Sequence, residues 1–157
     1  MIIIENTEYE DVIIENNEVE APLVQSSLLV SKDWSSKDSY LLAKIAMAEA
    51  EGEDLKGKAL VICVVLNRAN STSFPNTIEE VIFEKSGTSY QFSSVIPGGR
   101  WYTTEPNEDC YKAVEMVQNG WDESNGALYF ESCKNEDNWH SRNLTFLFKH
   151  ERHRFYK

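Results

Sequence analysis

The sequence lacks three features that define common protein classes: a cysteine framework, a signal peptide and a long apolar segment. Cys63, Cys110 and Cys133 are far apart and show no C-x-x-C spacing. We therefore expect neither a disulfide framework nor a zinc site, and interpret them as small buried side chains in a reducing compartment. No apolar run approaches the roughly 20 residues of a membrane span, and Glu5 follows residues 1–4 without the basic region of a secretory signal. We expect synthesis in the cytoplasm and no membrane insertion.

Basic residues are also scarce, because 15 Lys and Arg stand against 26 Asp and Glu, giving a net charge of −11. Such a charge repels phosphates, which argues against nucleic acid and anionic membranes as partners. The charge is uneven, at −7 for residues 1–33 and −4 for residues 34–157. We predict that residues 1–33 form an acidic tail, either flexible or a loosely held strand, which is a candidate docking segment for an unknown protein partner.

A chain of 157 residues with 41% hydrophobic residues is long enough for one domain with a real core, which we place at residues 34–157. Its patterns predict an α+β fold that is mainly helical, with a small β element late in the chain. The expected elements are helices over 36–51, 55–67 and 106–119, a short helix opened by Thr77, an irregular stretch over 84–104, a strand over 127–131 and two strands around 149–152.

The stretch AMAEAEGEDLKG, residues 46–57, contains four carboxylates. Glu49 follows Leu42 and Ile45 at helical spacing, so it lies on the apolar face of the predicted helix, at its C-terminal end. Burial there would raise the pKa of the carboxyl, and the helix dipole would act in the same direction. The pattern indicates either a general acid or a carboxylate that pairs with a buried arginine or accepts backbone hydrogen bonds.

Glu51 points away from that apolar face, and Glu53 and Asp54 follow the predicted helix end. Their spacing does not match an EF-hand calcium loop. We therefore interpret these three acids as a solvated face, with Asp54 available to cap the next helix.

Several short motifs along residues 34–157 carry a resemblance. They are AEAEGE (48–53), LNR (66–68), SFPNT (73–77), VIF (81–83), QFS (91–93), GW (120–121), ALYF (127–130) and HRFY (153–156). In order and spacing they resemble the cell wall hydrolase family that includes the spore cortex-lytic enzyme SleB.

The resemblance implies a lysozyme-like fold and cleavage of peptidoglycan glycan strands, in characterised members as a lytic transglycosylase. The family's catalytic glutamate falls on Glu49. No cofactor or metal is implied, and we expect a monomer that acts on the cell wall, either as a phage lysin or as a spore or wall enzyme. Two alternatives stay open: a hydrolase with a second carboxylate, for which Glu131 is the first candidate, and a non-catalytic wall-binding module.

Further residues are candidates for substrate binding. They are Gln91, Phe92, Trp101, Tyr129 and His153, with Trp139 as another possible stacking surface for sugars. Ordinary packing is the alternative for each aromatic residue, and we interpret His153 as a structural hydrogen-bond partner rather than a proton carrier. The spacing of the histidines predicts no metal site.

The chain departs from the family pattern at three positions. Ala48 stands where the family commonly has glycine, Glu51 where it has arginine, and Glu151 where a glycine usually precedes the final histidine. The last departure concerns the turn that places His153, and residues 1–33 have no counterpart that we can assign.

Overall fold

The computed structural model describes residues 33–134 and 137–157. Trp34–Lys157 forms one compact unit, and the predicted acidic tail lies outside the described residues, apart from Asp33. Among the described residues, no helix is both long and apolar enough to cross a membrane.

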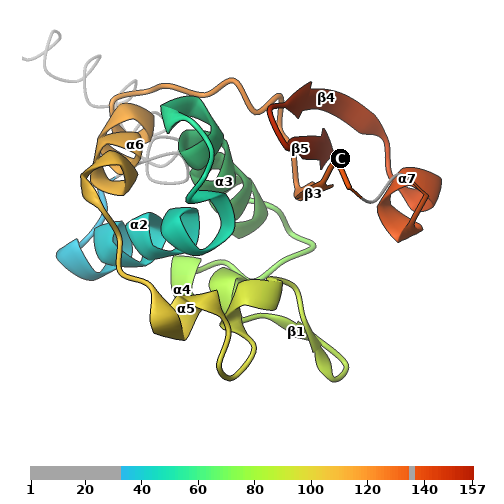
Figure 1. Ribbon diagram of the computed structural model, residues 1–157, viewed down its shortest axis with the longest axis horizontal. Coiled ribbons are helices and arrows are strands. Elements are labelled where there is room, and N and C mark those ends of the chain that lie inside the picture. The colour runs from blue at the N-terminus through green and yellow to red at the C-terminus, as the bar shows by residue number, and fades with distance from the viewer. Residues whose placement is uncertain (1–32, 135–136) are drawn as a thin grey trace, which may run out of the picture. The chain divides into compact units, whose positions relative to one another are not determined.

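Three helices, α2 (Ser36–Ala50), α3 (Leu55–Ala69) and α6 (Glu108–Gln118), pack together as the larger part of the domain (Figure 1). Side chains cap the first two. The Ser35 side chain accepts a hydrogen bond from a backbone N–H of the first turn of α2, and the Asp54 carboxylate does the same for α3, as predicted. Both helices begin at the predicted residues 36 and 55.

The stretch 84–104 is more regular than predicted, because it contains several very short elements. The short helix that precedes this stretch is capped by Thr77, as expected, because the Thr77 hydroxyl accepts a hydrogen bond of 3.2 Å from a backbone N–H. The elements of this region are α4 (Ile78–Ile82), β1 (Lys85–Ser86), β2 (Ser89–Tyr90), the 3-10 helix η1 (Ser93–Val95) and α5 (Arg100–Thr103).

A three-stranded antiparallel sheet closes the fold, with β3 (Tyr129–Ser132), β4 (Phe146–His150) and β5 (His153–Tyr156) in the order β3-β5-β4. The predicted turn after β4 is present, and Glu151 within it has a φ of 45°. Helix α7 (Trp139–Asn143) was also not predicted. It contains no buried residue, so its sequence has no apolar periodicity that would indicate a helix.

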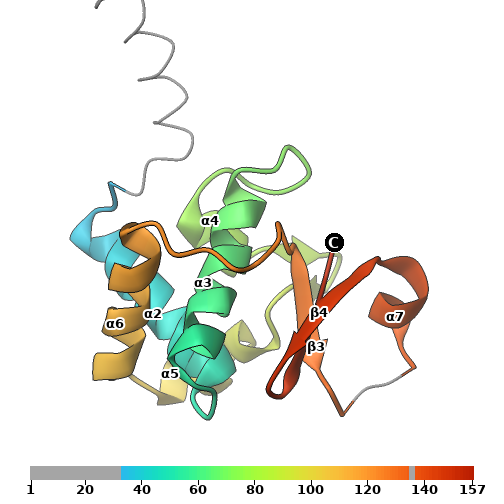
Figure 2. The same cartoon turned by 90° about the horizontal axis from the view of Figure 1, so that it is seen from above.

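Helix α3 connects the helical part to the sheet (Figure 2). One face of α3 contributes to the main core with α2 and α6. Its other face forms a second apolar cluster, which consists of Leu60, Val64, Ala127 and Phe155. The apolar segment ALVICVVL, residues 59–66, is therefore buried on most sides.

The cysteines follow their predicted burial only in part. Cys63 and Cys110 are buried thiols, whereas Cys133 is a thiol of intermediate exposure beside the turn of the late hairpin. The interpretation of Cys133 as a buried side chain is therefore wrong.

Candidate functional site

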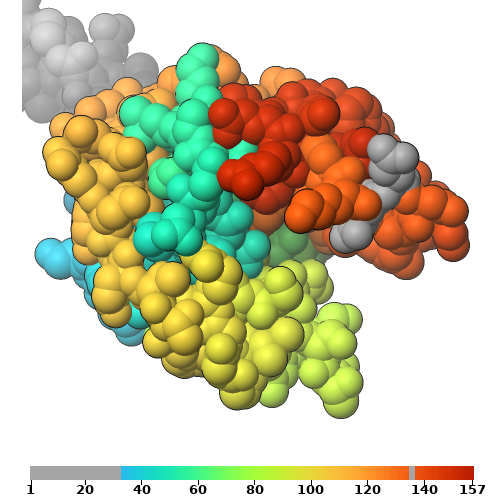
Figure 3. Space-filling model, in the orientation of Figure 1, coloured from blue at the N-terminus to red at the C-terminus, as the bar shows by residue number. Residues whose placement is uncertain are grey.

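A cavity of about 760 Å³ lies between the segment 86–93 and the side of the domain formed by β3 and α7. Figure 3 shows the surface hollowed between these two regions. Six separate parts of the chain line this cavity, and they bring together five of the predicted residues: Glu49, Gln91, Phe92, Tyr129 and His153.

A second cavity, of about 450 Å³, continues from the first. The two share Glu49, Ser132 and His153 among their lining residues. They therefore form one groove with Glu49 at the junction, a shape suited to a chain-like ligand that extends to both sides of that carboxyl.

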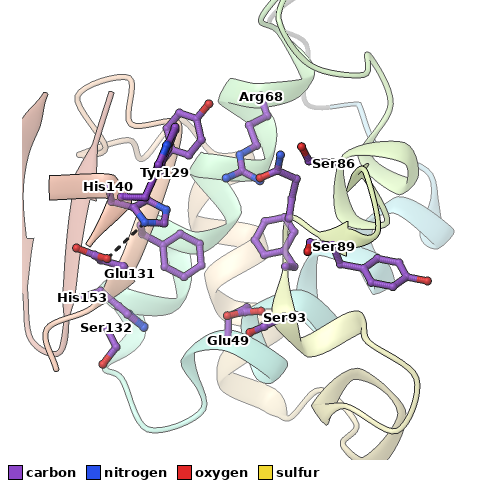
Figure 4. Close-up of a pocket in the computed structure, with 15 residues that line it drawn as sticks. Glu49, Arg68, Ser86, Ser89, Ser93, Tyr129, Glu131, Ser132, His140 and His153 are labelled. Carbon is purple, nitrogen blue, oxygen red and sulfur yellow. Dashed lines mark ion pairs between the residues drawn. The ribbon is translucent and has the colours of Figure 1, made fainter. Parts of the chain in front are cut away.

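Glu49 is the penultimate residue of α2, and its carboxyl faces the groove (Figure 4). Burial raises the pKa of this carboxyl, an effect that Ser94 and the positive charges of Arg68 and Arg100 only partly offset. Its Oε1 atom is buried and, among the described residues, accepts no hydrogen bond of standard geometry. The carboxyl therefore keeps its proton at a higher pH than an exposed glutamate would.

Ser94 is held against Glu49 by an unusually close backbone turn. Its carbonyl oxygen approaches Gly99 so closely that a Cβ atom there would lie only 2.4 Å from it. The Gly99 N–H also donates a hydrogen bond of 2.7 Å to Ile96. Glycine at position 99 thus permits the backbone approach that places Ser94, which lowers the pKa of Glu49.

Arg68, from the LNR motif, lines the groove although the sequence assigned it no role in the site. It is 3% exposed, and its Nε donates a hydrogen bond of 2.7 Å to the Leu128 carbonyl. Its guanidinium lies 4.9 Å from the Phe92 ring centroid and 5.3 Å from that of Tyr129. Burial lowers the pKa of Arg68 to about 10, so it stays positive at neutral pH and holds both aromatic rings in place.

Gln91 and Phe92 lie in the groove as expected from the resemblance, but their exposures differ. Gln91 is exposed, whereas Phe92 is 3% exposed and packs against Phe130 with ring centroids 6.1 Å apart. Tyr129 is half-buried, 5.8 Å from the Phe74 ring. Gln91 and Tyr129 are therefore accessible to a ligand, and Phe92 mainly supports the wall.

His153 in β5 differs from its interpretation as a structural hydrogen-bond partner. Its Nδ1 is buried and has no hydrogen-bond partner among the described residues. The ring contacts Phe130, with centroids 5.2 Å apart. Burial, assisted by the positive charges of Arg152 and His150, lowers the pKa of His153, so a neutral imidazole faces the groove at pH 7.

Trp101 lies outside both cavities, so the expectation that it binds substrate is not supported by its position. It is 6% exposed and packs in the core against Phe83, with ring centroids 5.2 Å apart. The Lys44 ammonium lies 5.3 Å from its ring centroid. The alternative of ordinary burial describes this tryptophan.

Glu131 lines the groove from β3 and is 8% exposed. The Tyr156 hydroxyl donates a hydrogen bond of 2.6 Å to its Oε1. Its Oε2 accepts a hydrogen bond from the Asn138 amide and lies 3.4 Å from Nδ1 of His140 (Figure 4). Both oxygens of this carboxylate therefore already have donors.

Of the other acids of the stretch 46–57, Glu51 and Asp54 are exposed as predicted, but Glu53 is not. Glu53 is 7% exposed and forms an ion pair of 3.0 Å with Arg152, whereas Glu51 is exposed and pairs with Arg100. Burial, and then Glu151, raises the pKa of Glu53. The prediction was wrong for Glu53 because its partner follows it by 99 residues, which no local pattern reveals.

Asp54, His150 and Glu151 could together hold a metal ion, since one ligand atom of each lies within 4.8 Å of the others. The same atoms already connect the α2–α3 loop to the late hairpin. Asp54 Oδ1 lies 2.7 Å from His150 Nε2, and the Asp54 N–H donates a hydrogen bond of 2.9 Å to Glu151. This side-chain group therefore acts as a clamp between two structural elements, one of which ends near Glu49.

Comparison with known proteins gives consistent matches. The family described as Cell Wall Hydrolase matches residues 52–156. A spore cortex-lytic enzyme of Oceanobacillus iheyensis is 40% identical over 104 residues, or 66% of this chain and 36% of that protein. One from Bacillus subtilis is 40% identical over 97 residues, or 62% of this chain and 30% of that protein.

Solved structures show the same similarity. The catalytic domain of the germination-specific lytic transglycosylase SleB from Bacillus anthracis has a TM-score of 0.67 and 33% identity, and covers 80% of this chain and 98% of that one. The catalytic domain of the Bacillus cereus SleB protein has a TM-score of 0.67 and 35% identity. That match covers 79% of this chain and 92% of the other. This likeness confirms the predicted α+β, lysozyme-like fold class.

The matches cover only part of the relatives. The chain spans about a third of the length of the curated relatives, at 36% and 30%. The family match begins at residue 52, so Glu49 lies just outside it and stands out by its position in the groove.

Proposed function

Because this chain belongs to the Cell Wall Hydrolase family, we propose that it cleaves peptidoglycan glycan strands between N-acetylmuramic acid and N-acetylglucosamine, with Glu49 as the catalytic group. The observation that carries the proposal is the buried carboxyl of Glu49, which faces the middle of a long groove and has a raised pKa. A general acid must be protonated when the substrate binds, and burial provides this condition.

The reaction is that of a lytic transglycosylase with a single carboxyl group. Glu49 donates its proton to the bridging oxygen while positive charge develops at C1 of the muramic acid residue. The carboxylate that results then accepts the proton of the C6 hydroxyl, and this oxygen attacks C1. The bond to the leaving sugar breaks, a 1,6-anhydro ring forms, and no water is consumed.

The other groove residues bind the strand in this proposal. The exposed amide of Gln91 offers both a donor and acceptors to sugar hydroxyls. The neutral imidazole of His153 lies at the junction with Glu49, where it can form a hydrogen bond without competing for the proton of Glu49. Phe92 and Tyr129 line the wall that Arg68 supports.

A muramidase-type hydrolase is the second candidate, and Glu131 is the residue that would serve as its second carboxylate. It lines the same cavity as Glu49. Both of its oxygens have donors from the protein, however, so a nucleophile or base would first have to lose hydrogen bonds. This arrangement favours the transglycosylase.

Mass spectrometry of the products of purified peptidoglycan tests the proposal. The wild type should release fragments with 1,6-anhydromuramic ends, and Glu49→Gln should reduce their rate of release by about 10²–10⁴-fold, the range for a general acid. Glu115→Gln is a control, because Glu115 is an exposed helical glutamate on α6 that lines neither cavity; its rate should stay near that of the wild type.

Each other outcome points to a different function. Reducing ends would identify a hydrolase and direct attention to Glu131. Binding to peptidoglycan without any cleavage, unchanged by Glu49→Gln, would indicate a wall-binding module instead.

The domain also acts as a monomer at the cell wall in this proposal. Sedimentation with and without peptidoglycan fragments would detect an obligate dimer.

A further inference from the structure

Helix α7 is unusual because it is fixed in place without apolar burial. None of its residues is buried. Its N-terminus is closed by a capping box in which the Asn138 side chain and Ser141 satisfy each other's backbone N–H groups. A five-residue helix without buried residues has little stability of its own, so its position beside the groove depends on side-chain contacts with the sheet, both polar contacts and ring contacts.

The polar contacts converge on Glu131. The Asn138 amide, which caps α7, donates a hydrogen bond to Oε2 of Glu131, and Nδ1 of His140 lies 3.4 Å from the same atom. The Tyr156 hydroxyl holds Oε1 from β5. One carboxylate thus connects α7 to two strands of the sheet, which is a positioning role.

The contact with Glu131 also places the His140 ring. Nδ1 is the ring nitrogen on the Glu131 side, 3.4 Å from Oε2, and His140 lines the cavity. The second ring nitrogen, Nε2, can therefore form a hydrogen bond with a ligand in the groove.

Trp139 provides an aromatic surface beside that acceptor. It lines the same cavity but is 58% exposed, an unusual position for a tryptophan. Its ring centroid lies 5.6 Å from that of His140 and 6.4 Å from that of Tyr129. An exposed indole next to the Nε2 atom of an imidazole matches a sugar ring, which has an apolar face and polar hydroxyl or acetamido groups at its edge.

We propose that Trp139 and His140, positioned by Glu131, form a distal saccharide subsite, in which one hexosamine ring of the strand packs on Trp139 and forms a hydrogen bond with Nε2 of His140. The inference rests on the proposed function, since it assigns a substrate unit to the same groove. It also gives Glu131 a role in binding in place of that of a second catalytic acid.

Calorimetry with the cleavage-deficient Glu49→Gln protein tests the subsite without turnover. The ligand is the peptide-free tetrasaccharide of two N-acetylglucosamine–N-acetylmuramic acid units. Adding Trp139→Ala should weaken binding about tenfold, the upper range for one stacked aromatic contact. Tyr111→Ala is the matched control, because Tyr111 is also an exposed aromatic but lies on α6 away from both cavities.

The role of Glu131 is tested in the otherwise wild-type enzyme. Glu131→Gln and His140→Ala should each raise KM more than they lower kcat, because they disturb binding at a distance from the reacting bond. If Glu131 were a catalytic carboxylate, Glu131→Gln would instead lower kcat by orders of magnitude with little change in KM. That result would overturn the inference.

The calorimetric outcomes separate the two proposals. If the tetrasaccharide binds and Trp139→Ala binds it as tightly as its parent, the subsite is disproved and the proposed function is untouched. If the parent fails to bind the tetrasaccharide at all, and the wild type releases no fragments from peptidoglycan, the proposed function is wrong and the subsite fails with it.

Discussion

On the wall of the groove formed by the ends of α2 and α3, Glu49 and Arg68 are buried with few hydrogen bonds, and burial changes the pKa of both. On the wall formed by β3 and α7, Glu131 is also buried, but it accepts hydrogen bonds from Tyr156 and Asn138, and His140 lies 3.4 Å away. The two walls thus hold carboxyl groups with different hydrogen-bond surroundings. A carboxyl deprived of donors is suited to proton transfer, and one supplied with donors is suited to holding its neighbours in place.

The comparison predicts that substitutions in the helical wall affect both stability and chemistry, whereas those in the α7 wall affect mainly binding.

The largest loss of stability is expected for Arg68→Ala. It removes a buried hydrogen bond and the contacts with two rings, which should cost about 3 kcal/mol and lower Tm by about 10 °C. The Glu49 carboxyl would also lose a positive neighbour, so the alkaline limb of the activity profile should move to higher pH. Arg68→Lys retains the charge and should restore that limb but not the full Tm. An unchanged profile in Arg68→Ala would show that the two groups do not interact.

Gly99→Ala should have the next largest effect. The added Cβ would clash with the Ser94 carbonyl, which we expect to cost about 2 kcal/mol and to lower kcat by displacing Ser94 from Glu49. Gly98→Ala is the control, because Gly98 has a φ of 79° but open space around its Cα. That variant should lose stability through backbone strain and retain its kcat. Equal kcat values for the two variants would contradict the role given to Ser94.

Glu53→Ala should cost less, about 1–2 kcal/mol, because it removes a buried acceptor of the Arg152 side chain. Glu51→Ala removes an exposed ion pair with Arg100 and should cost no more than about 1 kcal/mol. Urea denaturation measures both. The order would reverse if Glu53 were solvated, as its sequence context suggested.

The smallest effect is a gain. A buried carboxyl with a raised pKa binds its proton more tightly in the folded state than in the unfolded state, so it loses stability as pH rises from the unfolded pKa through the folded one. Glu49→Gln cannot ionise and avoids this loss. Its Tm should equal that of the wild type near pH 4 and exceed it by a few degrees at pH 8. A lower Tm at both pH values would indicate that the charged form is stabilised.

The helices and the site acid could be predicted from the sequence because the information for them is local. Apolar spacing and caps located α2 and α3, and the same spacing placed Glu49 on an inward face. The resemblance brought in residues from distant parts of the chain, such as Gln91 and His153, which the structure places in one groove with Glu49.

The remaining features depend on contacts between distant segments. Helix α7 has no apolar periodicity, and its position depends on Glu131, which belongs to another element. The burial of Glu53 depends on Arg152, and Trp101 could be assigned to the core only once Phe83 was seen beside it. Local patterns carry no information about such partners, so these residues were misassigned or missed.

The sheet order β3-β5-β4 places the last strand in sequence at the centre. While the chain is being synthesised, β3 and β4 therefore emerge before the strand that pairs with both, whereas α2 and α3 can dock as soon as they leave the ribosome. Glu131 gains its hydrogen bond from Tyr156 only when β5 has been added. Assembly thus has a fixed order, in which the wall that carries the acid forms first and the groove becomes complete in the last step of folding.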